Sequence, residues 1–267
     1  MTDDELFLTT ILQCSRSELF LRPAELTGEQ KERLASMQQR RANNEPVQYI
    51  CGFTEFMGYP VAVGPGVLVP RPETEVLVEA VVRELKANGQ RECRALDIGT
   101  GSGCIPIALV KEVASCRVIG IDISEEALVF ARRNAVLNGV AGQVEFIKQD
   151  MFWFLDAGNA GVGRSFDVIV SNPPYIPSAL IAGLPADVRQ EPVLALDGGP
   201  DGLHYYRYII PAAQRFLRSG GWLALEFGDG QSKELENLFA ITGGWDKIRF
   251  VKDNAGKSRI ALARRAD

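Results

Sequence analysis

The sequence of 267 residues has one histidine, no Cys-x-x-Cys pair and no long apolar run. The single histidine, His204, excludes a histidine-rich metal site, and a Ser-His-Asp mechanism would depend on this one residue. His204 lies where a helix is expected to begin, and we interpret it as an ordinary helix-start or surface residue. The five cysteines are odd in number and lack the spacing of a zinc site, which indicates reduced thiols and no metal.

Positive charge is also scarce, with 29 Lys and Arg residues against 34 Asp and Glu, a net charge of −5 and a pI of about 5.2. No basic field of the kind that attracts nucleic acid is expected, although a local basic patch stays open. The start, MTDDELF, lacks the charged-then-apolar pattern of a secretory signal, and no segment approaches the roughly 20 apolar residues of a membrane span. We expect a cytoplasmic protein that binds no membrane.

Three stretches of different character follow one another along the chain. Residues 1–45 contain short amphipathic helices and are expected to form a small helical N-terminal bundle. Residues 46–72 are β-rich with glycine and proline punctuation, which indicates a linker or hairpin. Residues 73–267 open with a helix over 73–89 and then alternate strands with helices. This predicts an α/β domain with a mostly parallel seven-stranded sheet, helices on both faces, and a final antiparallel hairpin.

A glycine-rich segment, LDIGTGSG at 96–103, follows the first strand of this domain and opens a helix. Glycine lets backbone amides approach a ligand closely, and a helix N-terminus adds positive potential. The spacing is G-x-G-x-G, and Cys104 stands where the dinucleotide-binding pattern needs glycine. Taken alone, the loop is also consistent with an ordinary tight turn.

Acidic residues end the next two strands. Asp122 ends the second strand, where a carboxylate accepts both hydroxyls of a ribose, and Asp150 and Met151 follow the third, where side chains frame an adenine. Asp97, just before the glycines, would repel a phosphate but attract an ammonium group. Because parallel strands point their carboxyl ends to one edge of the sheet, these residues predict a site for a nucleoside that carries an amino acid. S-adenosylmethionine fits that description.

The fourth strand, FDVIVS, leads into Asn172-Pro173-Pro174-Tyr175 at the same edge. Proline has a fixed φ, so this loop holds its hydrogen-bond acceptors rigidly. The Asn172 side-chain oxygen and the Pro173 carbonyl can each accept one N–H of a planar amide, and Tyr175 can stack on that amide. Prolines that merely end a strand and a tyrosine that merely fills the core are the plain alternative, which the neighbouring cofactor loop disfavours.

The motifs DIGTGSG, IDIS and NPPY together resemble class I S-adenosylmethionine-dependent methyltransferases that methylate nitrogen. Further stretches narrow the resemblance: EPVQYICGFTEFMG, LVPRPETE, VRQEPVLALDGGPDGLHYY and GGWLALEFGDGQ. Nearly the whole chain is similar to the HemK/PrmC family, which methylates the glutamine of the Gly-Gly-Gln motif in class I peptide chain release factors. The helical N-terminal region looks shorter than is usual in the family, and EFGDGQ differs slightly from the usual form of that strand end.

This resemblance implies a class I methyltransferase (Rossmann-like) fold, a cofactor and a set of site residues. The cofactor is S-adenosyl-L-methionine, which leaves as S-adenosyl-L-homocysteine. The implied cofactor-binding residues are Gly99, Thr100, Gly101, Ser102, Gly103, Asp122, Asp150, Met151 and Asn172. The implied substrate-binding residues are Asn172, Pro173, Pro174 and Tyr175, and of these Asn172, Pro173 and Tyr175 are the expected catalytic residues. Arg71, Glu73 and Glu75 are consistent both with the site entrance and with helix capping.

Two other functions compete with this interpretation. A methyltransferase acting on an exocyclic base amine of DNA or rRNA uses the same NPPY loop, but it needs a flipped base, a basic channel and usually a recognition domain. The net charge and the small N-terminal region argue against it. A non-catalytic binding module would more often have lost Asn172, Asp122 or a glycine. We therefore expect class I release factors as the protein partner, a role in translation termination, and no direct contact with nucleic acid.

Overall fold

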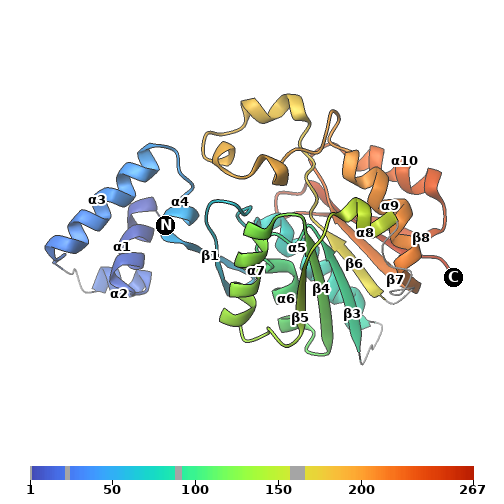
Figure 1. The fold of residues 1–267 in the computed structure, drawn as a ribbon, viewed down its shortest axis with the longest axis horizontal. Helices are drawn as coiled ribbons and strands as arrows, with labels where there is room; N and C mark the ends of the chain where they lie inside the picture. Colours follow the sequence, from blue (N-terminus) through green and yellow to red (C-terminus); the bar gives the residue numbers. More distant parts are fainter. Residues whose placement is uncertain (1, 22–24, 88–91, 157–165) are drawn as a thin grey trace.

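The computed structural model describes residues 2–21, 25–87, 92–156 and 166–267 (Figure 1). The helices are α1 (Asp3–Leu12), α2 (Arg16–Leu21), α3 (Gly28–Ala42), α4 (Val47–Cys51), α5 (Pro72–Ala87), α6 (Cys104–Glu112), α7 (Glu125–Leu137), α8 (Met151–Asp156), α9 (His204–Phe216) and α10 (Ser232–Thr242). The strands are β1 (Phe53–Phe56), β2 (Tyr59–Ala62), β3 (Cys93–Ile98), β4 (Cys116–Asp122), β5 (Val144–Lys148), β6 (Phe166–Ser171), β7 (Leu217–Glu226), β8 (Trp245–Lys252) and β9 (Ser258–Arg265). The predicted end of the 73–89 helix at Gly89 lies outside the described residues.

The main sheet has seven strands in the order β5-β4-β3-β6-β7-β9-β8. Neighbours from β5 to β7 pair in parallel, whereas β9 pairs antiparallel with both β7 and β8. The predicted mostly parallel sheet with a final antiparallel hairpin is therefore confirmed. Since β3 and β6 lie side by side although their sequences are far apart, the glycine loop and the NPPY loop leave adjacent strands.

The sheet is buried on both faces because successive side chains of a strand point to opposite sides. Ala95 and Val168 belong to a core beneath α5, α6 and α7, whereas Leu96 and Ile169 belong to a core beneath α8, α9 and α10. Figure 1 shows these two helical layers on either side of the sheet. Strands buried in this way consist of nearly continuous apolar residues, as the central strands here do.

The N-terminal helices form a separate small cluster to one side of the sheet (Figure 1). Phe7, Ile11, Met37 and Ile50 are its buried core. The Thr27 hydroxyl accepts a hydrogen bond from the Gln30 amide while the Gln30 side chain accepts one from the Thr27 amide, so this helix start is a capping box. Within the described residues, no helix is both long and apolar enough to cross a membrane.

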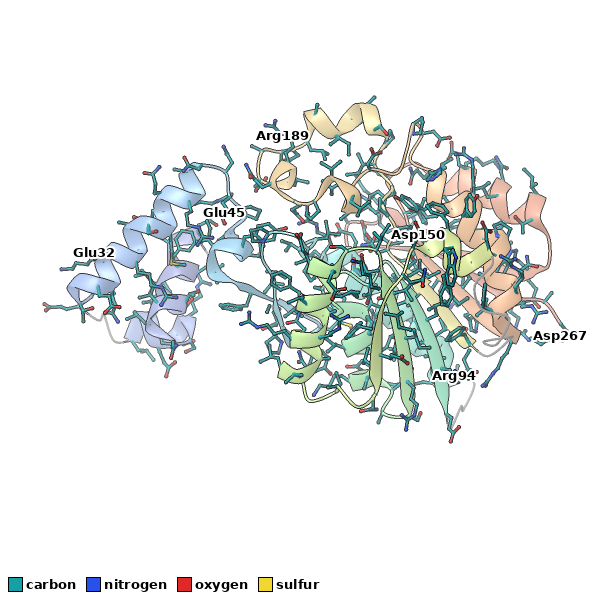
Figure 2. The ribbon with its side chains drawn as sticks, in the orientation of Figure 1. Glu32, Glu45, Arg94, Asp150, Arg189 and Asp267 are labelled. Atoms are coloured by element: carbon teal, nitrogen blue, oxygen red, sulfur yellow. The ribbon has the colours of Figure 1, made fainter. Side chains whose placement is uncertain are left out.

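The β1–β2 hairpin joins this cluster to the sheet domain. Buried Asn134 of α7 accepts a hydrogen bond from the Ala62 amide at 2.7 Å and donates one to the Ala62 carbonyl at 3.0 Å. A second contact joins the bundle to the loop that follows NPPY. Arg41 of α3 forms an ion pair with Asp187 of that loop at 3.4 Å. Figure 2 shows Arg189, which follows Asp187 by two residues, in the loops above the sheet, on the side that faces Glu45 and the N-terminal helices.

Candidate active site

The carboxyl ends of β3, β4, β5 and β6 open into a cleft of about 500 Å³. Figure 2 places Asp150 at this edge of the sheet and Arg94, near the start of β3, at the opposite edge. Most of the predicted site residues line the cleft: Gly99, Thr100, Gly101, Ser102, Asp122, Asp150, Met151, Asn172, Pro173 and Pro174. Gly103 and Tyr175 are not among its lining residues. The strand-end rule therefore brings together residues from four separate segments of the chain.

The glycine loop is shaped by hydrogen bonds to β4. The amides of Gly99 and Thr100 donate to the Ile121 carbonyl at 2.9 and 3.0 Å. The Gly101 amide donates to Asp122 Oδ2 at 2.8 Å. Gly103 has a φ of +77°, and a Cβ there would lie 3.1 Å from Ala131 Cα in α7. The absence of a side chain at Gly103 therefore lets the start of α6 pack closely against α7.

Two carboxylates lie beneath this loop in different environments. Asp122 accepts hydrogen bonds from the Gly101 and Ser124 amides, one on each oxygen, and burial nevertheless raises its pKa. Asp97 is fully buried, and among the described residues neither of its oxygens has a hydrogen-bond partner. Burial raises the pKa of Asp97 to about 7, and the charge of Asp122 also raises it. The Thr100 hydroxyl lies close enough to lower this pKa slightly but is not placed to form a hydrogen bond with either oxygen. Asp97 does not itself line the cleft, but an unpaired buried carboxylate beneath the glycine loop attracts a cationic group.

The part of the cleft formed by α8 and α9 is apolar and aromatic. Met151, Phe152 and Tyr205 line it, and the rings of Phe152 and Tyr205 stack with centroids 5.8 Å apart. The Asp150 carboxylate accepts a hydrogen bond from the Phe152 amide at 2.7 Å, which holds the start of α8 in place. A flat heterocycle would find apolar faces and a carboxylate edge at this end.

The Asn172 side chain is held from the side of α5. Its Nδ2 donates to Thr74 Oγ1 at 3.0 Å, and the Thr74 hydroxyl donates to Glu226 Oε2 at 2.6 Å. No described residue donates a hydrogen bond to Asn172 Oδ1 or to the Pro173 carbonyl. The strand end thus offers two free acceptors at the cleft.

Tyr175 lies behind the cleft and is fixed from the side of β7. Its hydroxyl donates to Glu226 Oε1 at 3.3 Å, and its carbonyl accepts a hydrogen bond from Gln231 Nε2 at 3.0 Å. Burial raises the pKa of the Tyr175 hydroxyl. The Tyr175 side chain packs against the core beneath α8, α9 and α10, and its predicted stacking on a substrate amide stays a prediction.

Two glycines lie too close to the Tyr175 backbone for a side chain to fit between them and it. A Cβ on Gly198 would lie 2.7 Å from Tyr175 Cα, and one on Gly202 would lie 2.3 Å from the Tyr175 carbonyl oxygen. Gly202 also has a φ of +75°, in the left-handed region that other residues rarely adopt. The LDGGPDGL segment is therefore rich in glycine because it wraps the NPPY loop.

Replacing Gly202 with alanine is expected to lower the free energy of unfolding by about 2–4 kcal/mol, from backbone strain and overpacking together. Urea unfolding measures the change. Gly142 offers a matched control, since a Cβ there meets nothing within 4 Å. Equal losses for Gly202→Ala and Gly142→Ala would contradict the close packing around Tyr175.

The acidic and basic residues before the glycine loop divide between capping and the cleft rim. Glu73 and Glu75 lie in the first turn of α5, and Glu75 also accepts a hydrogen bond from the Met57 amide at 2.7 Å. Arg71 lines the cleft and forms an ion pair with Glu191. The buried Glu191 carboxylate also accepts a hydrogen bond from the Val69 amide at 2.9 Å. This pair joins the segment before α5 to the loop after NPPY.

Sequence reasoning did not identify three of these residues: Thr74, Glu191 and Glu226. Each is a buried polar residue whose partners are distant in sequence. The only signal in the sequence for Glu226 is a carboxylate at the end of an apolar strand, WLALEF. Burial of a carboxylate requires partners, so such a residue is worth tracing to them.

Comparison with known proteins identifies two family models in the chain. A methyltransferase domain matches residues 90–247, and a PrmC N-terminal domain matches residues 2–52. The release factor glutamine methyltransferase of Thermodesulfovibrio yellowstonii is 38% identical over 96% of this chain and 89% of its own length. That of Agrobacterium fabrum is 39% identical over 99% of this chain and 90% of its own length.

Solved structures of lower identity share the fold. The catalytic domain of hMettl16 in complex with an RNA hairpin is 15% identical, with a TM-score of 0.60 over 90% of this chain and 82% of that one. A methyltransferase from Pyrococcus furiosus is 22% identical, with a TM-score of 0.54 over 87% of this chain and all of that one. At these identities the likeness concerns the arrangement of the sheet and helices.

Proposed function

This chain belongs to the release factor glutamine methyltransferase family. We propose that it methylates the side-chain amide nitrogen of the glutamine in the Gly-Gly-Gln motif of class I release factors. The observation that carries the proposal is the pair of free acceptors, Asn172 Oδ1 and the Pro173 carbonyl, beside the glycine loop. A primary amide has two N–H groups on one nitrogen, and two acceptors match them.

The cleft residues fit S-adenosylmethionine, whose sulfonium supplies an electrophilic methyl group when it is bound. Asp97 would attract the ammonium group, and Asp122 retains lone pairs on both oxygens for ribose hydroxyls. Gly99, Thr100, Gly101 and Ser102 would contact the methionyl part. Met151 and the aromatic end of the cleft would pack against the adenine, with Asp150 at its edge. We assign Gly103 to the packing that shapes the loop.

The NPPY loop addresses the poor nucleophilicity of an amide nitrogen, whose lone pair is delocalised into the carbonyl. Acceptors on both N–H groups fix the nitrogen and favour the more tetrahedral, electron-rich geometry of the transition state. Rigid placement of that nitrogen in line with the methyl group contributes much of the acceleration. Pro173 and Pro174 hold the loop rigid and Tyr175 supports it. When the N–C bond forms and the S–C bond breaks, S-adenosylhomocysteine would be the leaving group and the excess proton on nitrogen would pass to water.

We also propose the division of the chain into the N-terminal bundle at 1–45, the linker at 46–72 and the methyltransferase domain at 73–267, with α4 at the start of the linker packed on the bundle through Ile50. Figure 1 shows the loops between β6 and α9 extending toward the N-terminal bundle, and Arg41 of α3 pairs with Asp187 in these loops. This arrangement suits a protein substrate that contacts both. Reduced cysteines and a release-factor substrate support a cytoplasmic location.

Affinity for S-adenosylhomocysteine is expected to weaken as pH falls below about 7. Asp97 has its pKa raised to about 7, so its carboxylate is protonated at lower pH and loses its attraction for the ammonium group. One linked proton gives at most about tenfold per pH unit. Calorimetric titration between pH 8 and pH 6 measures the slope, and Asp97→Asn should bind more weakly at pH 8 with a flatter slope. The same slope in both proteins would contradict this assignment.

The test of the proposed function is methyl transfer from labelled S-adenosylmethionine to a purified class I release factor, with DNA and rRNA offered in parallel. We expect label in the release factor alone. Label in DNA or rRNA, with none in the factor, would instead identify a nucleic-acid methyltransferase that uses the same acceptors.

A further inference from the structure

Glu226 is a carboxylate buried at the end of β7, with only 1% of its surface exposed. Its two oxygens accept hydrogen bonds from different elements: Thr74 of α5 on Oε2 at 2.6 Å and Tyr175 of the NPPY loop on Oε1 at 3.3 Å. Its backbone carbonyl accepts the Tyr206 hydroxyl at 2.8 Å. A buried carboxylate is costly unless it is fully bonded, so its placement here calls for a function.

The hydrogen bonds that link Asn172 to Glu226 through Thr74 have a fixed direction. An ionised carboxylate only accepts hydrogen bonds, so the Thr74 hydroxyl must donate to it. That hydroxyl has then used its one proton and presents only lone pairs to Asn172. Asn172 must therefore turn its Nδ2 toward Thr74, at 3.0 Å, which leaves Oδ1 as the atom available to the cleft.

We propose that Glu226 and Thr74 are positioning residues that select the rotamer of the Asn172 amide, so that an acceptor and not a donor faces the substrate nitrogen. This inference rests on the proposed function. The opposite rotamer would place an NH₂ group against the N–H groups of the glutamine amide, where it cannot bond. The selection acts on the orientation of one side chain and leaves the cofactor end of the cleft unchanged.

The charge of Glu226 depends on groups from several elements packed around it. Burial raises its pKa to about 7, the Thr74 and Tyr175 hydrogen bonds lower it, Glu73 raises it and Arg259 lowers it. Cys104 and Tyr206 are further titratable neighbours, and burial keeps both neutral by raising their pKa values. Below about pH 7 the protonated carboxyl can donate to Thr74, which removes the constraint on Asn172.

The proposal is tested by kcat and KM for a release factor in three variants. Glu226→Gln keeps the shape but lets Thr74 accept as well as donate, and Thr74→Val removes the hydroxyl. Each should lower kcat about 10- to 100-fold, less than loss of a direct contact, with affinity for S-adenosylhomocysteine within about twofold of the wild type. Thr74→Ser restores a hydroxyl and should recover most of kcat. Thr242→Val in α10, which also loses a hydroxyl–carbonyl bond, is the matched control and should not change kcat.

Two further readouts separate positioning from general support of the fold. The double variant Glu226→Gln with Thr74→Val should lose no more kcat than the worse single variant, since both act through one hydrogen-bond chain. The fall of wild-type kcat below about pH 7, at saturating cofactor, should be weaker in Thr74→Val.

If the wild type methylates the factor and both Glu226→Gln and Thr74→Val keep full kcat, the positioning role is wrong while the proposed function stands. Additive losses, or no recovery in Thr74→Ser, would also overturn the positioning role. No methylation of the factor by the wild type would instead reject the proposed function.

Discussion

Replacing Asn172 with alanine is expected to lower kcat for methyl transfer by about 100- to 1000-fold, the range found when one preorganised hydrogen-bonding group is removed from a transition-state site. The substrate nitrogen would lose one of its two acceptors, and the Pro173 carbonyl alone leaves it free to rotate. Affinity for S-adenosylhomocysteine should stay largely intact, because the glycine loop, Asp97 and Asp122 are untouched. Steady-state kinetics and calorimetric titration measure the two effects separately.

A matched control for this change is Asn43→Ala, at the exposed C-terminal cap of α3. It should retain wild-type kcat. Turnover by Asn172→Ala equal to that of the control would remove Asn172 from the mechanism. An equal loss of kcat and of cofactor affinity would assign Asn172 to the cofactor site instead.

Replacing Asp122 with alanine is expected to weaken binding of S-adenosylhomocysteine by about 1.5–3 kcal/mol, the usual contribution of hydrogen bonds to a charged group. Two effects combine, since in the proposed complex the carboxylate binds the ribose hydroxyls, and in the structure it accepts hydrogen bonds from the Gly101 and Ser124 amides that shape the loop. Calorimetric titration gives the dissociation constant directly.

Asp122→Asn separates these two effects, because an amide keeps one acceptor oxygen but replaces the other with a donor. The affinity of Asp122→Asn for S-adenosylhomocysteine should lie between that of the wild type and that of Asp122→Ala. Asp246→Ala, at an exposed position of β8, controls for the change in net charge. Unchanged affinity in Asp122→Ala would contradict the assignment of this carboxylate to the cofactor site.

The parts of the fold that the sequence predicts are those set by local pattern and by chain direction. Apolar strands, capped helices and glycine turns define the alternating elements, and parallel pairing then places Asp122, Asp150 and Asn172 at one edge. The short helix α8 was not expected, because its six residues are almost all apolar and match a strand end as well as a helix. The strand β7 begins at Leu217, before the Gly220-Gly221 pair, so the glycines do not mark its start.

The supporting residues of the site are beyond local pattern. Thr74 and Glu226 are 152 positions apart, and Thr74 and Asn172 are 98 apart, so only the folded sheet brings them together. Gly103 and Tyr175 show a related limit. Their place in a motif does not reveal whether they face the cleft or pack behind it, which depends on neighbouring helices.

The most direct measurement locates the methyl group. Tandem mass spectrometry of a release factor treated with the enzyme and S-adenosylmethionine identifies the modified residue. A factor with the Gly-Gly-Gln glutamine replaced by alanine is the control. We predict one added methyl group, on that glutamine, and none in the replaced factor. A methyl group on any other residue, or equal modification of both factors, would contradict the central claim that this cleft methylates the glutamine amide.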